Sequence, residues 1–142
     1  RGLVGSEMCI RDRCPQCGHD RPLPADEWQA LLQEYMEGSD LSVQQASARL
    51  LAAAGVESPD ELHMRHAVGC EHCAGKGYRG RIGIYEILQN SRSVRQLIQR
   101  QARPSEIFDR AMAEGMRSLR QDALEKVLQG HIDLKQARLA YR

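Results

Sequence analysis

Cys14-Pro-Gln-Cys17 and Cys70-Glu-His-Cys73 are two short turns, and the second continues directly into Ala-Gly-Lys-Gly-Tyr-Arg-Gly-Arg-Ile-Gly-Ile-Tyr-Glu-Ile-Leu88. Each Cys-x-x-Cys turn presents two thiolates from one tight loop, and a tetrahedral zinc ion takes four such ligands at about 2.3 Å. We therefore predict that the four cysteines bind one structural zinc ion. No coordination position is left open for a substrate, so a structural role is favoured over a catalytic one.

The interval between the two turns, residues 18–69, is longer than the roughly 15–20 residues of common zinc motifs. Loop closure grows only as about (3/2)RT ln n, so lengthening a loop from ~17 to ~52 residues costs on the order of 1 kcal/mol. Structural zinc contributes an apparent ~10–16 kcal/mol in small domains, so the spacing does not exclude the site. Two alternatives remain open: redox-active pairs, as in a thiol-handling chaperone, and buried free thiols.

Small and cationic residues surround both turns. Gly18 follows the first pair and Ala74-Gly75 follows the second, which lets backbone amides turn toward the sulfurs. Cationic or potentially cationic side chains that would offset the net −2 charge of a tetrathiolate zinc centre are Arg13, His19, Arg21, His72, Lys76 and Arg79. Because the cysteines complete the coordination shell, we expect the nearby histidines to be solvated or packed. Cys9 is a spare fifth thiol.

The composition is that of a balanced polypeptide with few aromatic residues. Lys plus Arg number 20 against 19 for Asp plus Glu, a formal net charge of +1 that gives no overall bias toward nucleic acid or anionic lipid. The strongest apolar stretch, around residues 50–56, falls short of the roughly 20 residues of a membrane-spanning helix. No secretory signal is visible, so we expect the cysteines to lie in a reducing cytoplasm, where metal binding is favoured over disulfides.

Hydrophobic periodicity changes along the chain and predicts mainly helices. Residues 1–13 show neither helical nor strand periodicity, and we expect them to be frayed or displaced. The expected elements are helices over residues 25–37 and 42–54, a short helical turn over 58–61, an extended stretch over 63–67, a loop over 69–80, a strand over 81–88, and helical stripes over 94–98, 107–112 and 118–129, with a last short helix after Asp133. A proline-flanked turn is expected at residues 22–24.

These elements predict an α+β fold that is mainly helical. A small zinc-binding subdomain with a short β segment is followed by a C-terminal helical bundle. We divide the chain into a divergent N-terminal segment (1–13), a tetracysteine subdomain with a helical insert (14–80), a strand (81–89) and a C-terminal helical subdomain (90–142).

The stretch from Gly69 to Leu88 closely resembles the end of the ATPase core in the GspE/PilB family of type II secretion and type IV pilus assembly ATPases. Further segments resemble the C-terminal helices of that family in the same order: Ser93-Val-Arg-Gln-Leu-Ile98, Glu114-Gly-Met-Arg-Ser-Leu-Arg-Gln-Asp122 and Glu125-Lys-Val-Leu-Gln-Gly130. Cys14-Pro-Gln-Cys17 matches the first metal pair of the family, so the resemblance covers about residues 14–142.

The resemblance implies the C-terminal portion of a homohexameric cytoplasmic motor, peripheral to the inner membrane, that couples ATP hydrolysis to an inner-membrane platform protein. By position, residues 81–89 resemble the strand that returns into the ATPase sheet. The Walker A and Walker B motifs of the family lie upstream of Cys14 and are not in this sequence. We therefore assign ATP and Mg²⁺ to the full-length parent only and predict no catalytic or nucleotide-binding residue in this chain, which we expect to be inactive alone.

Residues 1–13 depart from the family pattern, which has a basic and hydrophobic strand before the first cysteine pair. Val4-Gly-Ser-Glu-Met-Cys-Ile-Arg-Asp12 looks foreign in that position. The alternative function is a free-standing structural zinc module that binds nucleic acid or protein. The balanced charge and the scarcity of aromatic residues interleaved with Lys or Arg argue against nucleic acid as a partner.

Overall fold

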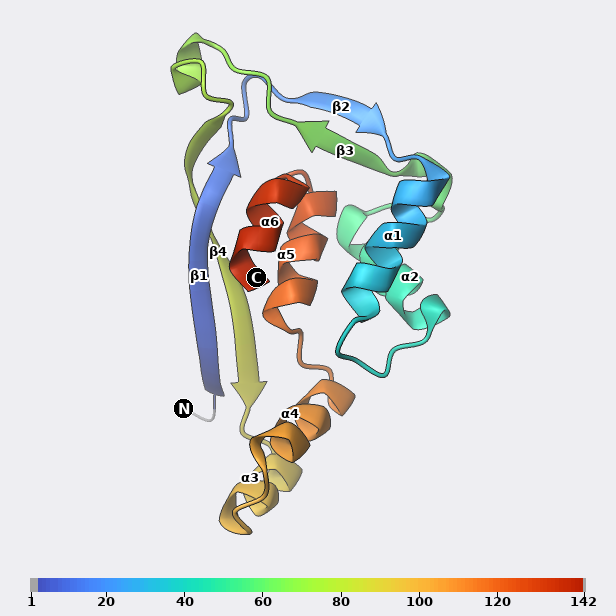
Figure 1. The fold of residues 1–142 in the computed structure, drawn as a ribbon, viewed down its shortest axis with the longest axis vertical. Helices are drawn as coiled ribbons and strands as arrows, with labels where there is room; N and C mark the ends of the chain where they lie inside the picture. The colour runs from blue at the N-terminus through green and yellow to red at the C-terminus, as the bar shows by residue number, and fades with distance from the viewer. Residues whose placement is uncertain (1–2, 142) are drawn as a thin grey trace.

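A long two-stranded ribbon runs along one side of the molecule, and helices pack against one of its faces (Figure 1). The computed structural model describes the backbone of residues 3–141 and the side chains from Cys9 to Tyr141. The four strands are β1 (Leu3–Arg13), β2 (His19–Pro22), β3 (His63–His66) and β4 (Tyr78–Gln89). The six α-helices are α1 (Ala25–Met36), α2 (Val43–Ala54), α3 (Arg92–Gln99), α4 (Pro104–Ala113), α5 (Leu119–Leu128) and α6 (Leu134–Tyr141). The mainly helical α+β class predicted from the sequence is confirmed.

Two antiparallel ribbons meet near the cysteine turns. β1 pairs with β4 so that Cys9 lies opposite Gly83 and Ile10 opposite Ile82, and β2 pairs with β3. The expectation that residues 1–13 would be frayed or displaced is wrong from Leu3 onward. Backbone hydrogen bonding needs no particular side chain, and buried Ile10 anchors the strand in the core. The foreign origin of this segment stays a prediction.

Two stretches that we expected to be turn or loop are partly strand, because strand pairing extends further than the sequence pattern indicates. Tyr78 to Gly80 belong to β4 rather than to the preceding loop, and Glu71–Cys73 within that loop form one 3-10 turn. β2 takes the place of part of the expected proline-flanked turn. Its four residues are all exposed, so they show none of the alternation that marks a half-buried strand.

The α2 helix shows how local sequence sets element ends. The Ser42 hydroxyl accepts from the Gln45 N–H at 3.1 Å, and the Gln45 side chain accepts from the Ser42 N–H at 2.9 Å. This reciprocal pair is a capping box. Gly55 then ends the helix in the left-handed region, with φ 74°.

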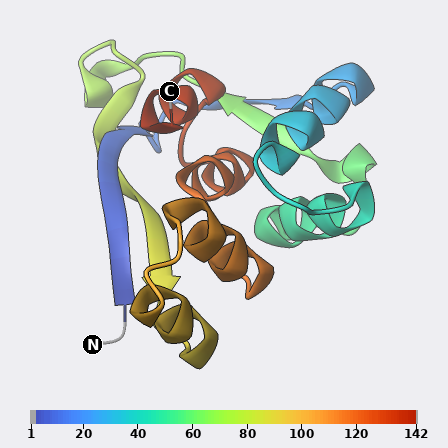
Figure 2. The same cartoon turned by 60° about the horizontal axis from the view of Figure 1, so that its bottom comes forward.

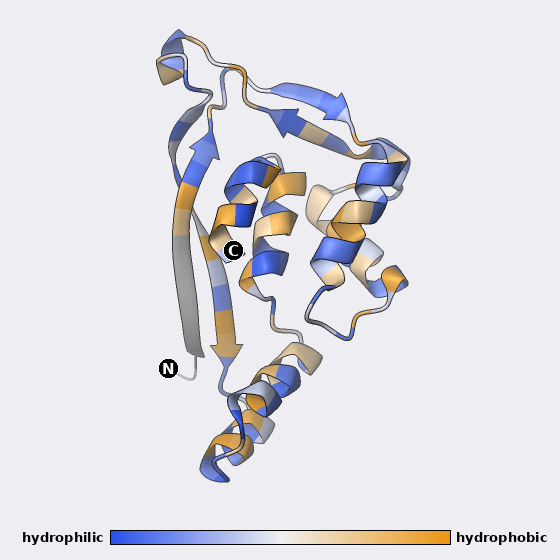
Figure 3. Ribbon diagram, viewed as in Figure 1, coloured by the Kyte–Doolittle hydropathy of each residue, from blue (hydrophilic) through white to orange (hydrophobic). Residues whose placement is uncertain are grey.

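The helix α5 is shared by two hydrophobic cores. One core joins α5 to α1 and α2 and consists of Trp28, Leu31, Leu32, Tyr35, Ala46, Leu50, Leu62, Leu124 and Leu128. The other joins α5 to α6 and the long ribbon and consists of Ile10, Met64, Ile84, Ala123, Val127, Ile132, Ala137 and Ala140. Figure 3 shows hydrophobic and hydrophilic residues alternating along α1 and α5, as expected for helices with one buried face. The cores therefore link the helical insert between the cysteine pairs to the C-terminal helices.

The helices α3 and α4 form a pair at one end of the molecule, beyond the end of β4 (Figure 2). They pack on each other, and the Ser91 hydroxyl caps α3 by accepting from the Val94 N–H at 3.2 Å. The Glu114 carboxylate, just after α4, accepts from the hydroxyls of Ser91 and Ser93. These bonds tie the start of α3 to the end of α4. Pro104 opens α4 at a position where its missing N–H has no helical partner to lose.

The core between α1, α2 and α5 should dominate the stability of the helical insert. Leu50 is 0% exposed within it, whereas Val43 on the same helix is 44% exposed. We expect Leu50→Ala to lower the free energy of unfolding by about 2–5 kcal/mol, because it removes apolar contacts and leaves a cavity. Val43→Ala should change it by less than about 1 kcal/mol. Denaturant unfolding followed by circular dichroism measures both, and equal losses would contradict the assigned core.

Candidate metal centre

The structure brings together the four cysteines that the sequence analysis selected. Cys14 follows β1 and Cys17 precedes β2, while Cys70 comes just before the 3-10 turn that leads to β4 and Cys73 is the last residue of that turn. Both turns therefore lie where the long ribbon and the short ribbon meet, at the end of the molecule opposite α3 (Figure 1). The Cys14 N–H donates to the Gly77 carbonyl oxygen at 3.0 Å, which joins the first turn to the loop after the second.

The sulfur positions match a tetrahedral site. All four Sγ atoms lie within 4.8 Å of one another. The Sγ atoms of Cys14 and Cys70, of Cys17 and Cys73, and of Cys70 and Cys73 are each 3.8 Å apart. Four thiolates at about 2.3 Å from a central ion would be separated by about 3.8 Å, whereas a disulfide requires about 2.05 Å. The cysteines are free thiols in an arrangement that can hold a metal ion.

Backbone N–H groups donate to one sulfur in each turn, those of Cys17 and Cys73. The Cys73 Sγ accepts from the N–H groups of Cys70 at 3.2 Å and Gly77 at 3.1 Å, and the Cys17 Sγ accepts from Gly69 at 3.3 Å. Burial alone would raise the pKa of Cys73. Hydrogen bonds from the N–H groups of Cys70 and Gly77, and from neighbouring thiols, outweigh this effect and lower the pKa to about 6. Burial and hydrogen bonds from the neighbouring thiols raise the pKa of Cys70 to about 11. Hydrogen bonds from backbone N–H groups thus favour the thiolate form of Cys73, the form in which cysteine binds a metal ion.

Left-handed backbone positions shape this loop. Ala74 has φ 55°, and Gly75 and Gly77 have φ 77° and 82°. This path turns the Gly77 N–H back toward Cys73, as the small residues after the second pair predicted. Gly69, at φ 107°, approaches the same loop so closely that a Cβ would lie 2.6 Å from the Gly75 carbonyl oxygen. Only glycine fits at that position.

Gly18 has a different role from the one expected. Its φ lies outside the left-handed region, and a Cβ there would collide with the guanidinium of Arg65, 2.7 Å from Cζ. Arg65 comes from β3 and also donates from Nη2 to the Pro15 carbonyl oxygen at 3.4 Å. The sequence analysis missed this residue, because nothing in the spacing of Arg65 from the cysteines indicates that β3 would place it against the first turn.

The flanking cations contact the turns unevenly. The Arg79 guanidinium lies 2.7 Å from the His72 Nε2 and donates to the His72 carbonyl oxygen at 2.9 Å, so it is fixed beside the second turn. Arg13 is buried, and burial together with nearby Arg65 lowers its pKa. Among the described residues the histidines do not join the metal-ligand cluster. Cys9 is exposed on β1.

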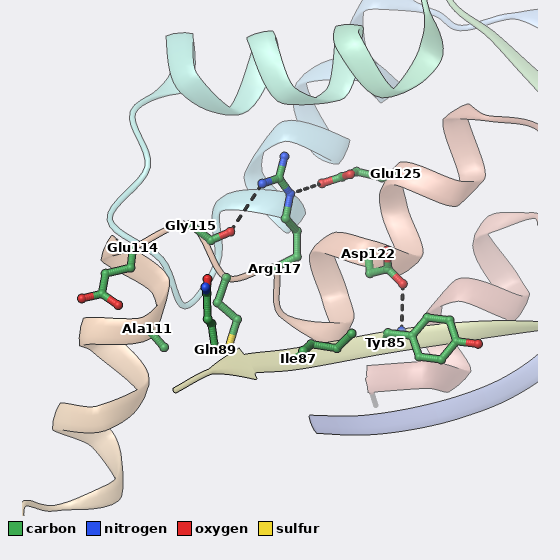
Figure 4. A pocket seen from close by; sticks show the side chains of 10 residues that line it. Tyr85, Ile87, Gln89, Ala111, Glu114, Gly115, Arg117, Asp122 and Glu125 are labelled. Atoms are coloured by element: carbon green, nitrogen blue, oxygen red, sulfur yellow. Dashed lines mark hydrogen bonds and ion pairs between the residues drawn. The ribbon is translucent and has the colours of Figure 1, made fainter. Parts of the chain in front are cut away.

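A cavity of about 520 Å³ lies away from the cysteines, between β4, the end of α4 and α5 (Figure 4). The Tyr85 N–H on the strand donates to the Asp122 carboxylate on α5 at 2.8 Å. Arg117 donates from Nε to the Glu125 carboxylate at 3.1 Å, and Glu125 also accepts from the buried Tyr35 hydroxyl at 2.6 Å. These polar groups are paired within the chain and serve to hold β4, α5 and α1 together.

Comparison with known proteins extends the similarity over nearly the whole chain. A family model described as "Type II/IV secretion system protein" matches residues 3–139. The type IV pilus assembly ATPase PilB of Myxococcus xanthus is 33% identical over 94% of the chain, and the type II secretion system protein E of Pseudomonas aeruginosa is 33% identical over 89%. The type IV pilus assembly ATPase TfpB of Acinetobacter baylyi is 27% identical over 94%. The chain spans only about a fifth of the length of these relatives: 20%, 20% and 19%.

No helix in residues 3–141 is long and apolar enough to cross a membrane.

The close approach of Gly69 to Gly75 predicts which glycine the metal loop depends on. Gly69→Ala should weaken Co²⁺ binding by about tenfold or more, in the 10–100-fold range of changes just outside a metal shell, because the new Cβ would push against the Gly75 carbonyl. Gly75→Ala also places alanine at a positive φ, 77° against 107° for Gly69, but its Cβ meets nothing within 4 Å, so it should bind more tightly than Gly69→Ala. Titration followed by the absorption of the cobalt–thiolate complex measures both. Equal affinities would contradict the steric argument.

Proposed function

Because the chain belongs to the family of type II/IV secretion system proteins, we propose that it is the C-terminal zinc-binding and helical portion of an ATPase that powers type II secretion or type IV pilus assembly. Its relatives are named as ATPases of both machines, and the family match over residues 3–139 is the observation that carries the proposal. The chain corresponds to about a fifth of each relative, so ATP and Mg²⁺ belong to the remainder of the parent protein. Neither a Walker A nor a Walker B motif occurs in the 142 residues.

We assign zinc to the four-cysteine site. Four thiolates in a closed tetrahedron suit Zn²⁺, and sulfur separations of 3.8 Å fit its bond length. The ion would be held by Cys14, Cys17, Cys70 and Cys73. When bound, it would cross-link the two cysteine turns and would not take part in a reaction. Backbone N–H groups would stabilise the negative charge on the sulfurs of Cys17 and Cys73. The two turns would hold one end of each of the four strands near the ion.

The module has a mechanical place in the motor that we propose. Zinc would stiffen the end of the long ribbon, and the helices α1 and α2 would be carried on α5 as one body because they share its core. The full-length protein would assemble as a homohexamer, act in the cytoplasm at the inner membrane and contact the membrane platform protein of its machine. The tetracysteine subdomain offers this assembly a rigid surface that contains no catalytic group of its own.

The alternative of a free-standing zinc module that binds nucleic acid is less well supported. It accounts for the four cysteines but not for the family match through α3, α4 and α5 to residue 139. The formal net charge of +1 gives no electrostatic drive toward nucleic acid. No nucleic-acid partner is therefore expected.

Zinc content tests the metal assignment directly. The purified chain should contain one zinc ion per molecule by elemental analysis, and Cys14→Ser should lose it, because three thiolates and a distant hydroxyl no longer close the tetrahedron. Cys9→Ser is the matched control, since Cys9 is exposed and outside the cluster, and it should retain full zinc content. A metal-free wild-type chain, or loss of zinc from the Cys9 variant, would refute the assignment.

Exchange into a relative tests the motor assignment. Residues 3–139 should replace the matching stretch of the Acinetobacter baylyi type IV pilus assembly ATPase TfpB and leave a protein that hydrolyses ATP and supports pilus assembly. The same chimera with Cys14→Ser is expected to assemble fewer pili, because its metal module is disrupted. A folded, zinc-containing chimera with no ATPase activity and no pili would count against the proposal.

A further inference from the structure

The first cysteine turn is held by a contact that the four sulfurs do not explain. Arg65 extends from β3 across the turn from Cys14 to Gly18 and donates to the Pro15 carbonyl oxygen at 3.4 Å. Its side chain is 34% exposed, and its nearest carboxylate, that of Asp20, is 4.0 Å away and 60% exposed. An ion pair of this kind contributes little, so Asp20 does not account for the position of Arg65.

The Arg65 Nε is buried and has no hydrogen-bond partner among the residues that the structure describes: the Asp20 Oδ1 that it faces is 4.0 Å away, too far for a hydrogen bond. A buried N–H of a charged group is normally paired, because leaving it unpaired is costly. Besides the exposed Asp20 carboxylate, a second source of negative charge on this side of the molecule is the cysteine cluster, which would have a net charge of −2 when four thiolates bind a divalent ion. The first turn of that cluster is the part that Arg65 contacts.

Gly18 is the complementary half of this contact. The space that its Cβ would fill is occupied by the Arg65 guanidinium, with Cζ 2.7 Å and Cδ 2.8 Å from that point. The backbone of Gly18 is not in the left-handed region, so alanine could adopt its conformation without strain. The space at position 18 is therefore occupied by the Arg65 side chain, and a larger residue there would have to displace that side chain and would not strain the backbone of the turn.

We propose that Arg65 is a positioning residue of the metal centre: it clamps the Cys14–Cys17 turn against β3 through Pro15 and Gly18 and places a positive charge beside the anionic metal–thiolate cluster. This inference rests on the proposed metal site. It explains why the short β2–β3 ribbon is attached to the cysteine turns, since β3 delivers the arginine. Residues just outside a metal shell commonly change metal affinity 10–100-fold when replaced.

Co²⁺ titration of the metal-free 142-residue chain tests the proposal. Arg65→Met should weaken Co²⁺ binding by about tenfold or more, while Arg65→Lys, which keeps a cation and a donor, should recover most of that loss. Arg81→Met is the matched control, because Arg81 is an exposed arginine on β4, and its affinity should stay near that of the wild type. Equal losses in the Lys and Met variants, or in the Arg81 control, would overturn the charged clamp.

A double-mutant cycle gives a sharper test, because Gly18→Ala should act only by displacing Arg65. It should weaken Co²⁺ binding in the wild-type background and have no further effect in the Arg65→Met background. An additive loss, or unchanged affinity in both single variants, would overturn the inference. A wild-type chain that binds no Co²⁺ would instead refute the metal site itself. Thermal unfolding of the metal-free variants should match the wild type, which separates a role at the metal from a role in the fold.

Discussion

The convergence of two cysteine turns across residues 18–69 is the constraint on which the rest of the molecule depends. It fixes the start of β2 near the end of β1 and the start of β4 near the end of β3, so each ribbon has one end attached to the same cluster. The interval between the turns is then a closed loop whose helices must lie to one side, against α5. Sulfur separations of 3.8 Å show that this closure is achieved with the geometry of a metal tetrahedron and without disulfides.

The parts of the fold that could be predicted are those with local signals. Helix α2 has a capping box at Ser42 and a terminal glycine at position 55, and it lies within a residue of its expected range. Helix α5 has its own capping box at Ser118 and Gln121, with both hydrogen bonds present. The four cysteines could be selected because they fall into two Cys-x-x-Cys turns, a pairing typical of metal sites.

The parts that escaped prediction depend on pairing over long distances. β1 has no clear alternation, and its strand conformation is set by β4, which lies far along the chain. β2 is exposed along its length, so no hydrophobic pattern could mark it. Arg65 reaches the first turn only because β3 pairs with β2, and Gly18 was attributed to turn flexibility when its real neighbour is that arginine. The conformations of β1 and β2 and the contact between Arg65 and Gly18 depend on tertiary contacts, which a single sequence does not reveal.

The length of β4 has a mechanical consequence. Its 12 residues run from just after the cysteine turns to just before α3, a span of about 40 Å at ~3.3 Å per residue, and its pairing with β1 is regular from Arg81 to Gln89. A paired ribbon stretches little, because extension would break its cross-strand hydrogen bonds. The regularly paired part of the ribbon therefore links the region of the cysteine turns to the start of α3 through continuous hydrogen-bonded backbone, and a displacement at one end would have to break these bonds to be absorbed within it.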